Sequence, residues 1–278
     1  MSASLLPLRP LGQTGMQVSC LGLGTVKIGR NEGVKYPSDF KLPDDASVQH
    51  ILHLCTEAGM NLIDTAPAYG NSEERLGKLL QERHRWIICS KVGEEFNNGV
   101  SSFDFSAKHV RHSIERSLQR LRTDYLDIVL VHSDGNDEAI IHNSDCFEAL
   151  QRARDAGLIR AFGMSTKTIA GGLLTVQHAD VVMVTLNPSA TDDAVVIAAA
   201  HAQQKGVFIK KALNSGHMAA QSEPSADPVR QSLDFVYSHP GVSSVIIGSI
   251  TPRNLQHNIA CAVLAADSST IQAQEMSC

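Results

Sequence analysis

Ionisable or hydroxyl side chains end four successive apolar runs of this sequence. They are Asp64, Lys91, His132 and Ser165, and Tyr69 lies in the loop that follows the first of them. Such groups are costly to place at the end of a buried run unless they are paired. In a barrel of parallel strands the carboxyl ends share one face, where barrel enzymes carry their catalytic residues. The sequence therefore predicts a catalytic site at that face, built from groups that can transfer protons.

The stretch from Asn61 to Gly77 shows how these groups are positioned. Leu62-Ile63 is a short apolar run that Asp64 closes, and a loop containing Tyr69 follows. Ser72, followed by two glutamates, indicates the start of a helix, because the helix dipole favours acidic residues in the first turn. The stretch therefore predicts a strand, a loop and a helix, with an acid at the end of the strand.

The same alternation continues along the chain. We expect strands at 18–25, 61–64, 86–91, 128–132, 160–165, 181–186, 207–211 and 244–248, and helices at 46–58, 72–82, 106–121, 144–156, 167–177, 192–205, 227–238 and 252–262. The strands are continuous apolar runs, as expected when both faces of a parallel sheet are buried. Eight such units predict an α/β protein with a (β/α)8 TIM barrel, and residues around Gly12 and Gly15 predict a short N-terminal β-hairpin.

A doubly wound open sheet is the alternative architecture. It would need a Gly-x-Gly-x-x-Gly turn after its first strand, and the pair Gly22 and Gly24 lacks the third glycine. We therefore expect one domain over residues 1–278, with the barrel at about 18–262 and a polar tail at about 263–278.

Composition excludes several other classes of protein. The net charge is −5 and no basic stripe is present, which argues against nucleic-acid binding. No run approaches the roughly 18 apolar residues of a membrane span, and residues 1–10 do not resemble a signal peptide. Cys20, Cys55 and Cys89 lie in apolar segments, which is typical of reduced core thiols. We expect a cytoplasmic protein with no metal site, because the helically spaced histidine pairs lack a third ligand.

The catalytic segments resemble those of the aldo-keto reductase superfamily. The frame Asp64-Thr-Ala-x-x-Tyr69-Gly-x-Ser-Glu is similar to the family signature, the segment 89–93 to its lysine strand and the segment 127–132 to its histidine strand. The resemblance extends from about residue 8 to residue 258 and implies a catalytic tetrad of Asp64, Tyr69, Lys91 and His132.

The resemblance also implies the reaction, which is reversible reduction of an aldehyde or ketone to an alcohol. A nicotinamide supplies the hydride and Tyr69 the proton. A free tyrosine, with a pKa of about 10, is too weak an acid, and a nearby ammonium lowers that pKa. Lys91 is the candidate for this role, with Asp64 as its counter-ion, and His132 would orient the carbonyl.

The cofactor expected from the resemblance is NADPH, with NADH as the other candidate. The residues that match the family's cofactor contacts are Gly24, Thr25, Ser165, Thr166, Met183, Lys210, Lys211, Ala212, Leu213, Gly248, Ser249, Arg253, Asn254 and Asn258. Three positions depart from the family pattern: Thr166 replaces an asparagine, Met183 a glutamine, and a lysine of the pair Lys210-Lys211 the aromatic that stacks on the nicotinamide.

Two other functions compete with this interpretation. The altered carboxamide contacts, Thr166 and Met183, are compatible with a non-catalytic nicotinamide-binding sensor or subunit on the same fold. An unrelated phosphate-binding barrel, such as an isomerase, would leave the tetrad unexplained. The expected partner is a small-molecule carbonyl substrate, and we expect a monomer or a weak homo-oligomer.

Overall fold

Eight parallel strands form a closed barrel in the computed structural model, which describes residues 5–34, 36, 39–214 and 227–275, with side chains to Asp267. The strands, in their order around the barrel, are β3 (Leu21–Gly24), β4 (Leu62–Asp64), β5 (Ile87–Val92), β8 (Leu126–His132), β9 (Ile159–Ser165), β10 (Val181–Thr185), β11 (Gly206–Lys210) and β12 (Ser244–Ile247). The (β/α)8 barrel predicted from the sequence is confirmed.

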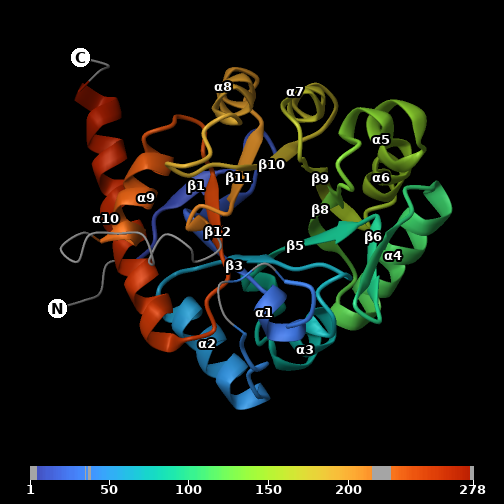
Figure 1. Ribbon diagram of the computed structural model, residues 1–278, viewed down its shortest axis with the longest axis horizontal. Helices are drawn as coiled ribbons and strands as arrows, with labels where there is room; N and C mark the ends of the chain where they lie inside the picture. Colours follow the sequence, from blue (N-terminus) through green and yellow to red (C-terminus); the bar gives the residue numbers. More distant parts are fainter. Residues whose placement is uncertain (1–4, 35, 37–38, 215–226, 276–278) are drawn as a thin grey trace.

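Helices surround the barrel on its outer side (Figure 1). Those that connect successive strands, or follow the last one, are α2 (Asp45–Glu57), α3 (Ser72–Leu79), α4 (Ala107–Leu121), α6 (Cys146–Asp155), α7 (Ile169–His178), α8 (Ala194–Ala202), α9 (Pro228–Tyr237) and α10 (Pro252–Glu275). The short helices α1 (Val26–Gly29) and α5 (Asp137–Asn143) and the 3-10 turn η1 (Arg83–Arg85) are additional. No described helix is long and apolar enough to cross a membrane.

An N-terminal hairpin closes one end of the barrel. Its strands β1 (Leu8–Pro10) and β2 (Gln17–Ser19) pair antiparallel, and Leu11, Met16 and Val18 pack into the barrel interior. The hairpin was predicted, but the strand expected at 18–25 is two strands. β2 belongs to the hairpin, and β3 begins the barrel after a break at Cys20.

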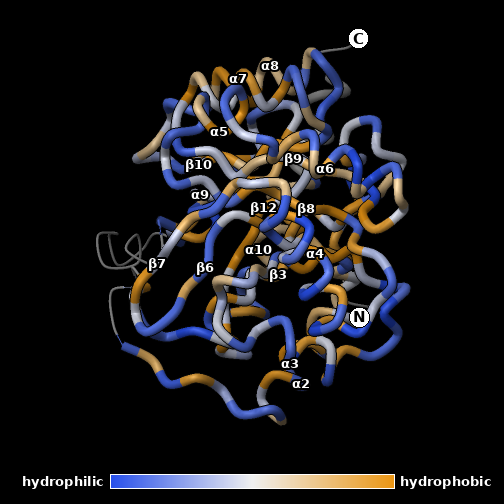
Figure 2. The backbone as a smooth tube through the Cα atoms, turned by 90° about the vertical axis from the view of Figure 1, so that its right-hand side faces the viewer, coloured by the Kyte–Doolittle hydropathy of each residue, from blue (hydrophilic) through white to orange (hydrophobic). Residues whose placement is uncertain are grey.

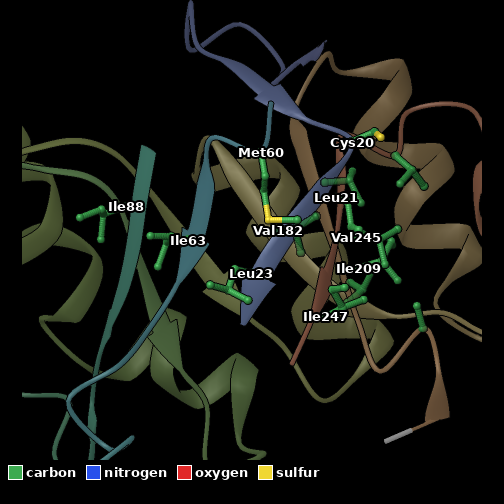
Figure 3. Packing of buried hydrophobic residues seen from close by; sticks show 14 of the residues in the cluster. Cys20, Leu21, Leu23, Met60, Ile63, Ile88, Val182, Ile209, Val245 and Ile247 are labelled. Carbon is green, nitrogen blue, oxygen red and sulfur yellow. The ribbon is translucent and has the colours of Figure 1, made fainter. Parts of the chain in front are cut away.

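Side chains of the strands alternate between two apolar layers. One layer lies between the sheet and the helices, and Figure 3 shows Leu21, Ile63, Ile88 and Val245 among its members. The other layer fills the barrel interior and includes residues such as Leu62, Cys89, Leu130 and Phe208. The residues two positions further along the same strands are Asp64, Lys91, His132 and Lys210. Because side chains alternate with a period of two, these four residues form a polar ring directly above the apolar interior of the barrel.

A second hairpin follows β5 and was not predicted. Its strands β6 (Glu94–Asn97) and β7 (Val100–Phe103) pair antiparallel beside the barrel (Figure 2). The turn residues Asn98 and Gly99 both have positive φ, 51° and 81°, as a tight hairpin turn requires. Asn-Gly between short strands is the sequence signal for such a turn, and the hairpin was therefore detectable.

The C-terminal helix is longer than predicted. The helix expected at 252–262 continues to Glu275, so most of residues 263–278 is helical, and 276–278 lie outside the described residues. The residues after Ala262 include several alanines and neither glycine nor proline, and nothing there stops a helix. The prediction of reduced thiols agrees with the structure, because the five described cysteines are free and buried.

Candidate active site

A buried ion pair lies at the ends of β4 and β5. Lys91 Nζ donates to Asp64 Oδ1 at 2.5 Å and to the carbonyl oxygen of Thr65 at 2.9 Å. Lys91 is 2% exposed and Asp64 4% exposed. Burial acts to lower the pKa of Lys91, but the Asp64 carboxylate outweighs it and the pKa is raised. The lysine therefore remains an ammonium ion inside the barrel mouth.

Tyr69 lies above this pair on the loop that follows β4. Its ring centroid is 4.8 Å from Lys91 Nζ. The loop turns at Gly70, where φ is +62° and an added Cβ would lie 2.1 Å from the carbonyl oxygen of Gly29, so no other residue fits without a backbone shift. Burial raises the pKa of Tyr69 and Lys91 acts to lower it, with burial the larger effect. The phenol is therefore protonated in the free protein and able to donate a proton.

His132 stands beside the tyrosine at the end of β8. The two rings meet edge to face, with centroids 6.0 Å apart at 85°. The opposite side of the imidazole faces Glu94, whose Oε2 is 2.6 Å from Nδ1. Among the described residues Nδ1 has no well-aligned hydrogen-bond partner, so its contact with Glu94 is a close electrostatic one. Burial lowers the pKa of His132, and Glu94 opposes that shift.

Glu94 was not identified from the sequence. It is the first residue of β6, and Ser101 Oγ on β7 donates to its Oε1 at 2.6 Å. Burial acts to raise the pKa of Glu94, but the contacts with His132 and Ser101 outweigh it and lower the pKa to about 2. The β6–β7 hairpin therefore supplies a fixed negative charge behind the catalytic histidine candidate.

Replacing Glu94 with Gln tests this charge through the pH dependence of stability. The folded-state pKa of Glu94 is lowered, so its ionised form stabilises the fold above the unfolded pKa of about 4.3, and this contribution is lost as pH falls toward 2. We expect the variant to be less stable at neutral pH by about 1–3 kcal/mol, and the deficit to shrink between about pH 5 and pH 3. Urea unfolding at several pH values measures both quantities.

The control for this experiment is Glu115→Gln, which removes a carboxylate from an exposed pair with Arg111. Exposed pairs contribute little, so this variant should match the wild type. A Glu94→Gln deficit that stays constant across the pH range would contradict the assignment.

On the other side of the polar ring, Lys210 faces the carboxyl end of β9. Its Nζ donates to Ser165 Oγ at 2.9 Å and to the carbonyl oxygen of Thr166 at 2.6 Å. Burial, assisted by the charge of Lys211, lowers the pKa of Lys210 to about 7. Thr166 Oγ1 is buried and has no hydrogen-bond partner in the part of the chain that the structure describes. A polar ligand that reached this corner would satisfy it.

Some of the residues that match the family's cofactor contacts do not face the corner of the barrel mouth formed by Thr166 and Lys210. Met183 packs in the barrel interior, and its carbonyl accepts from the Thr166 amide. Thr25 Oγ1 donates to the carbonyl oxygen of Asp64 and accepts from Ser72, so it ties β3 to the loop. Lys211 is exposed, with a φ of +56°. Of the two lysines in the aromatic's place, Lys210 is therefore the one that points inward.

Ala212 and Leu213 continue from Lys211 as framework. The carbonyl of Ala212 accepts from Ser232 Oγ on α9, and Leu213 packs against the outer apolar layer.

The last group of matched residues lies between β12 and α10. A Cβ placed on Gly248 would lie 3.6 Å from the carbonyl oxygen of Gly24 and 3.5 Å from the hydroxyl of Tyr36, so the two glycines and this tyrosine are neighbours. Ser249 is half-buried, Arg253 and Asn254 are exposed, and Asn258 is buried on α10. Tyr36 was missed because it lies in a segment that the sequence marks only as a loop.

The chain is similar to known proteins over most of its length. A sequence profile of the aldo/keto reductase family matches residues 20–216. L-galactose dehydrogenase of Arabidopsis thaliana is 27% identical over 293 aligned positions, covering 92% of this chain and 88% of that protein. NADH-specific methylglyoxal reductase of Escherichia coli is 32% identical over 168 positions, covering 55% and 50%. The crystal structure of PA4992 from Pseudomonas aeruginosa, assigned to the aldo-keto reductases, is similar with a TM-score of 0.86, 51% identity and coverage of 95% and 98%.

Proposed function

The chain belongs to the aldo/keto reductase family, and we propose that it reduces a small carbonyl compound with NADPH, using Tyr69 as the proton donor. The observation that carries this proposal is the buried Asp64–Lys91 pair beneath the Tyr69 ring. Burying a lysine and an aspartate is costly, and a pair placed beside a protonated phenol has a clear use in acid catalysis.

The pair acts on the charge that develops during proton donation. Lys91 has three N–H donors, and Asp64 and the carbonyl of Thr65 accept two of them. The third remains for the phenol oxygen of Tyr69. As the phenol gives up its proton, its oxygen becomes negative, and the ammonium stabilises that charge in a site of low dielectric.

His132 orients the substrate in this proposal. It stands beside the Tyr69 ring, so a carbonyl oxygen that accepts from the phenol also lies near the imidazole. Glu94 holds the ring from behind and opposes the lowering of its pKa by burial, and in the protonated form Nε2 can donate to the same oxygen. The two donors would then fix the carbonyl carbon in one position.

The corner of the polar ring beside Thr166 and Lys210 suits a nicotinamide, which would supply the hydride when bound. The unpartnered Thr166 hydroxyl and the amine of Lys210 are a donor set suited to the carboxamide. Met183 lies in the core, so the amide contact that the family makes at this position is absent here. In this proposal Lys210 takes the place of the stacking aromatic and holds the nicotinamide ring through polar contacts.

Single-turnover oxidation of bound NADPH tests the function. An excess of a reactive aldehyde should convert one equivalent of NADPH per protein chain. Tight binding without any oxidation would favour the non-catalytic sensor instead, and the altered contacts at Thr166 and Met183 are the observations that favour that alternative.

Small polar carbonyl compounds, such as the open forms of sugars, are the proposed substrate class. The mouth of the barrel carries Lys91, His132, Glu94 and Lys210, which favour hydroxylated molecules over apolar ones. L-galactose dehydrogenase is among the relatives. A panel of sugars, short aldehydes and hydrophobic ketones should therefore show the highest kcat/KM for hydroxylated substrates.

The preference between NADPH and NADH is proposed to depend on Arg253. This exposed residue lies in the first turn of α10, next to Ser249 and the Gly248 corner. The 2′-phosphate of NADPH needs a cation or donors, and one charge-assisted contact corresponds to about a ten- to hundredfold preference. We expect Arg253→Ala to remove most of that preference, as measured by the two dissociation constants.

Arg111→Ala is the matched control, because Arg111 is also exposed but lies on α4. It should leave both dissociation constants unchanged. Equal affinity for NADPH and NADH in the wild type would show that Arg253 is not a discriminator. A preference for NADH would also show it, and one relative is named as NADH-specific.

A further inference from the structure

Three potential metal ligands meet where α9 and α10 lie side by side (Figure 1). Asp227 precedes the first turn of α9, and His257 and Cys261 are one turn apart on α10. His257 Nε2 lies 3.2 Å from Asp227 Oδ2, Cys261 Sγ lies 3.4 Å from the same oxygen, and Sγ lies 3.6 Å from Nε2. All three ligand atoms are therefore mutual neighbours.

These distances match one face of a zinc tetrahedron. Zinc binds nitrogen, oxygen and sulfur at about 2.0–2.3 Å, and ligands at tetrahedral angles then lie about 3.3–3.6 Å apart. We propose that Asp227, His257 and Cys261 form a binding site for one zinc ion. Three protein ligands leave a fourth position, which faces solvent because Asp227 and His257 are partly exposed.

Hydrogen bonding alone accounts for less of this arrangement. A neutral imidazole can donate from Nε2 to Asp227, and the thiol of Cys261 can donate to the same carboxylate. The third contact, between Sγ and Nε2 at 3.6 Å, can be a hydrogen bond only if one of these two donors is diverted from the carboxylate, because each group has a single proton to donate. A cation at the centre would make all three contacts favourable.

The carboxylate is already fixed in position. Asp227 Oδ1 accepts from the backbone amides of Val229 and Arg230 as the N-cap of α9. Oδ2 has the Cys261 thiol as its hydrogen-bond partner and is directed at α10. Hydrogen bonds that surrounding groups make to a ligating side chain orient that side chain and strengthen its binding to the metal.

The donor set selects zinc over the hard cations. One sulfur, one imidazole nitrogen and one carboxylate oxygen suit zinc, whereas magnesium and calcium prefer oxygen ligands. A thiol with the ordinary pKa of about 8.5 is mostly protonated at neutral pH before a metal binds. Binding therefore breaks the S–H bond, forms a metal–thiolate bond and releases one proton to solvent.

Titration of the tag-free, chelator-treated protein with Co²⁺ tests the site. Co²⁺ replaces zinc in such sites, and a thiolate ligand gives it a charge-transfer absorption band. We expect one Co²⁺ per chain, a thiolate band, release of about one proton, and displacement by an equivalent of Zn²⁺. Cys261→Ser should abolish the band, and His257→Ala should weaken binding by about a hundredfold or more.

Cys55→Ser is the matched control, because Cys55 is also a buried helical cysteine but belongs to no group of three potential metal ligands among the described residues. It should leave the band unchanged, and circular dichroism checks that each variant is folded. Absence of a thiolate band in the folded wild type would overturn the proposal. Binding that Cys261→Ser does not alter would also overturn it, since it would come from other surface histidines.

Discussion

Replacing Tyr69 with Phe should lower kcat by at least about a hundredfold while the protein still binds NADPH. The change removes one hydroxyl from a ring 4.8 Å from Lys91 Nζ and keeps the volume of the side chain. Without the phenol, the proposed acid is missing and no hydroxyl lies between the Lys91 ammonium and the carbonyl oxygen to donate the proton. Because only the step that develops charge is affected, KM and the dissociation constant of NADPH should change little.

Tyr125→Phe is the control for this prediction. Tyr125 lies just before β8, where Arg83 and Arg160 stack over its ring, and it is remote from the barrel mouth. This variant should keep normal turnover. A Tyr69→Phe protein that reduces aldehydes at nearly the wild-type rate would refute the role of Tyr69 as the acid, although the family assignment would stand.

The barrel and its polar ring could be predicted because both follow from local pattern. Apolar runs bounded by turn residues mark the strands, and the period of two then sets which residue points inward. Asp64, Lys91 and His132 each lie two positions after an interior apolar residue. Their convergence therefore needed only the assumption of a parallel barrel.

Contacts between distant segments could not be predicted in this way. Glu94 contacts His132 because it follows the end of β5, which pairs with β8 in the barrel, but no local signal specifies the direction in which the chain leaves β5. Asp227 and His257 are 30 positions apart in the sequence, and no local pattern predicts their contact. The sequence also left open which lysine of the pair Lys210-Lys211 faces the barrel mouth. The structure directs Lys210 inward, because β11 ends at Lys210 and the chain turns at Lys211.

The second large effect is expected for Lys91→Met. The variant should lose activity by at least about a hundredfold, because nothing then stabilises the phenolate that Tyr69 becomes. It should also lose about 3–5 kcal/mol of stability, because Asp64 is left as a buried charge without its partner. The pKa of Lys91 is raised in the folded protein, so its contribution is fully present at neutral pH and is lost only above its unfolded pKa of about 10.4. Urea unfolding at neutral pH and steady-state kinetics measure the two losses.

The double variant Asp64→Asn, Lys91→Met separates the two effects. Removing both charges removes the orphaned carboxylate, so most of the lost stability should return, since replacing a whole buried pair is often nearly neutral. Activity should not return, because the ammonium is still missing. If Lys91→Met kept full turnover, Lys91 could not be the cation that supports Tyr69. If the double variant recovered turnover together with stability, the pair would serve the fold alone.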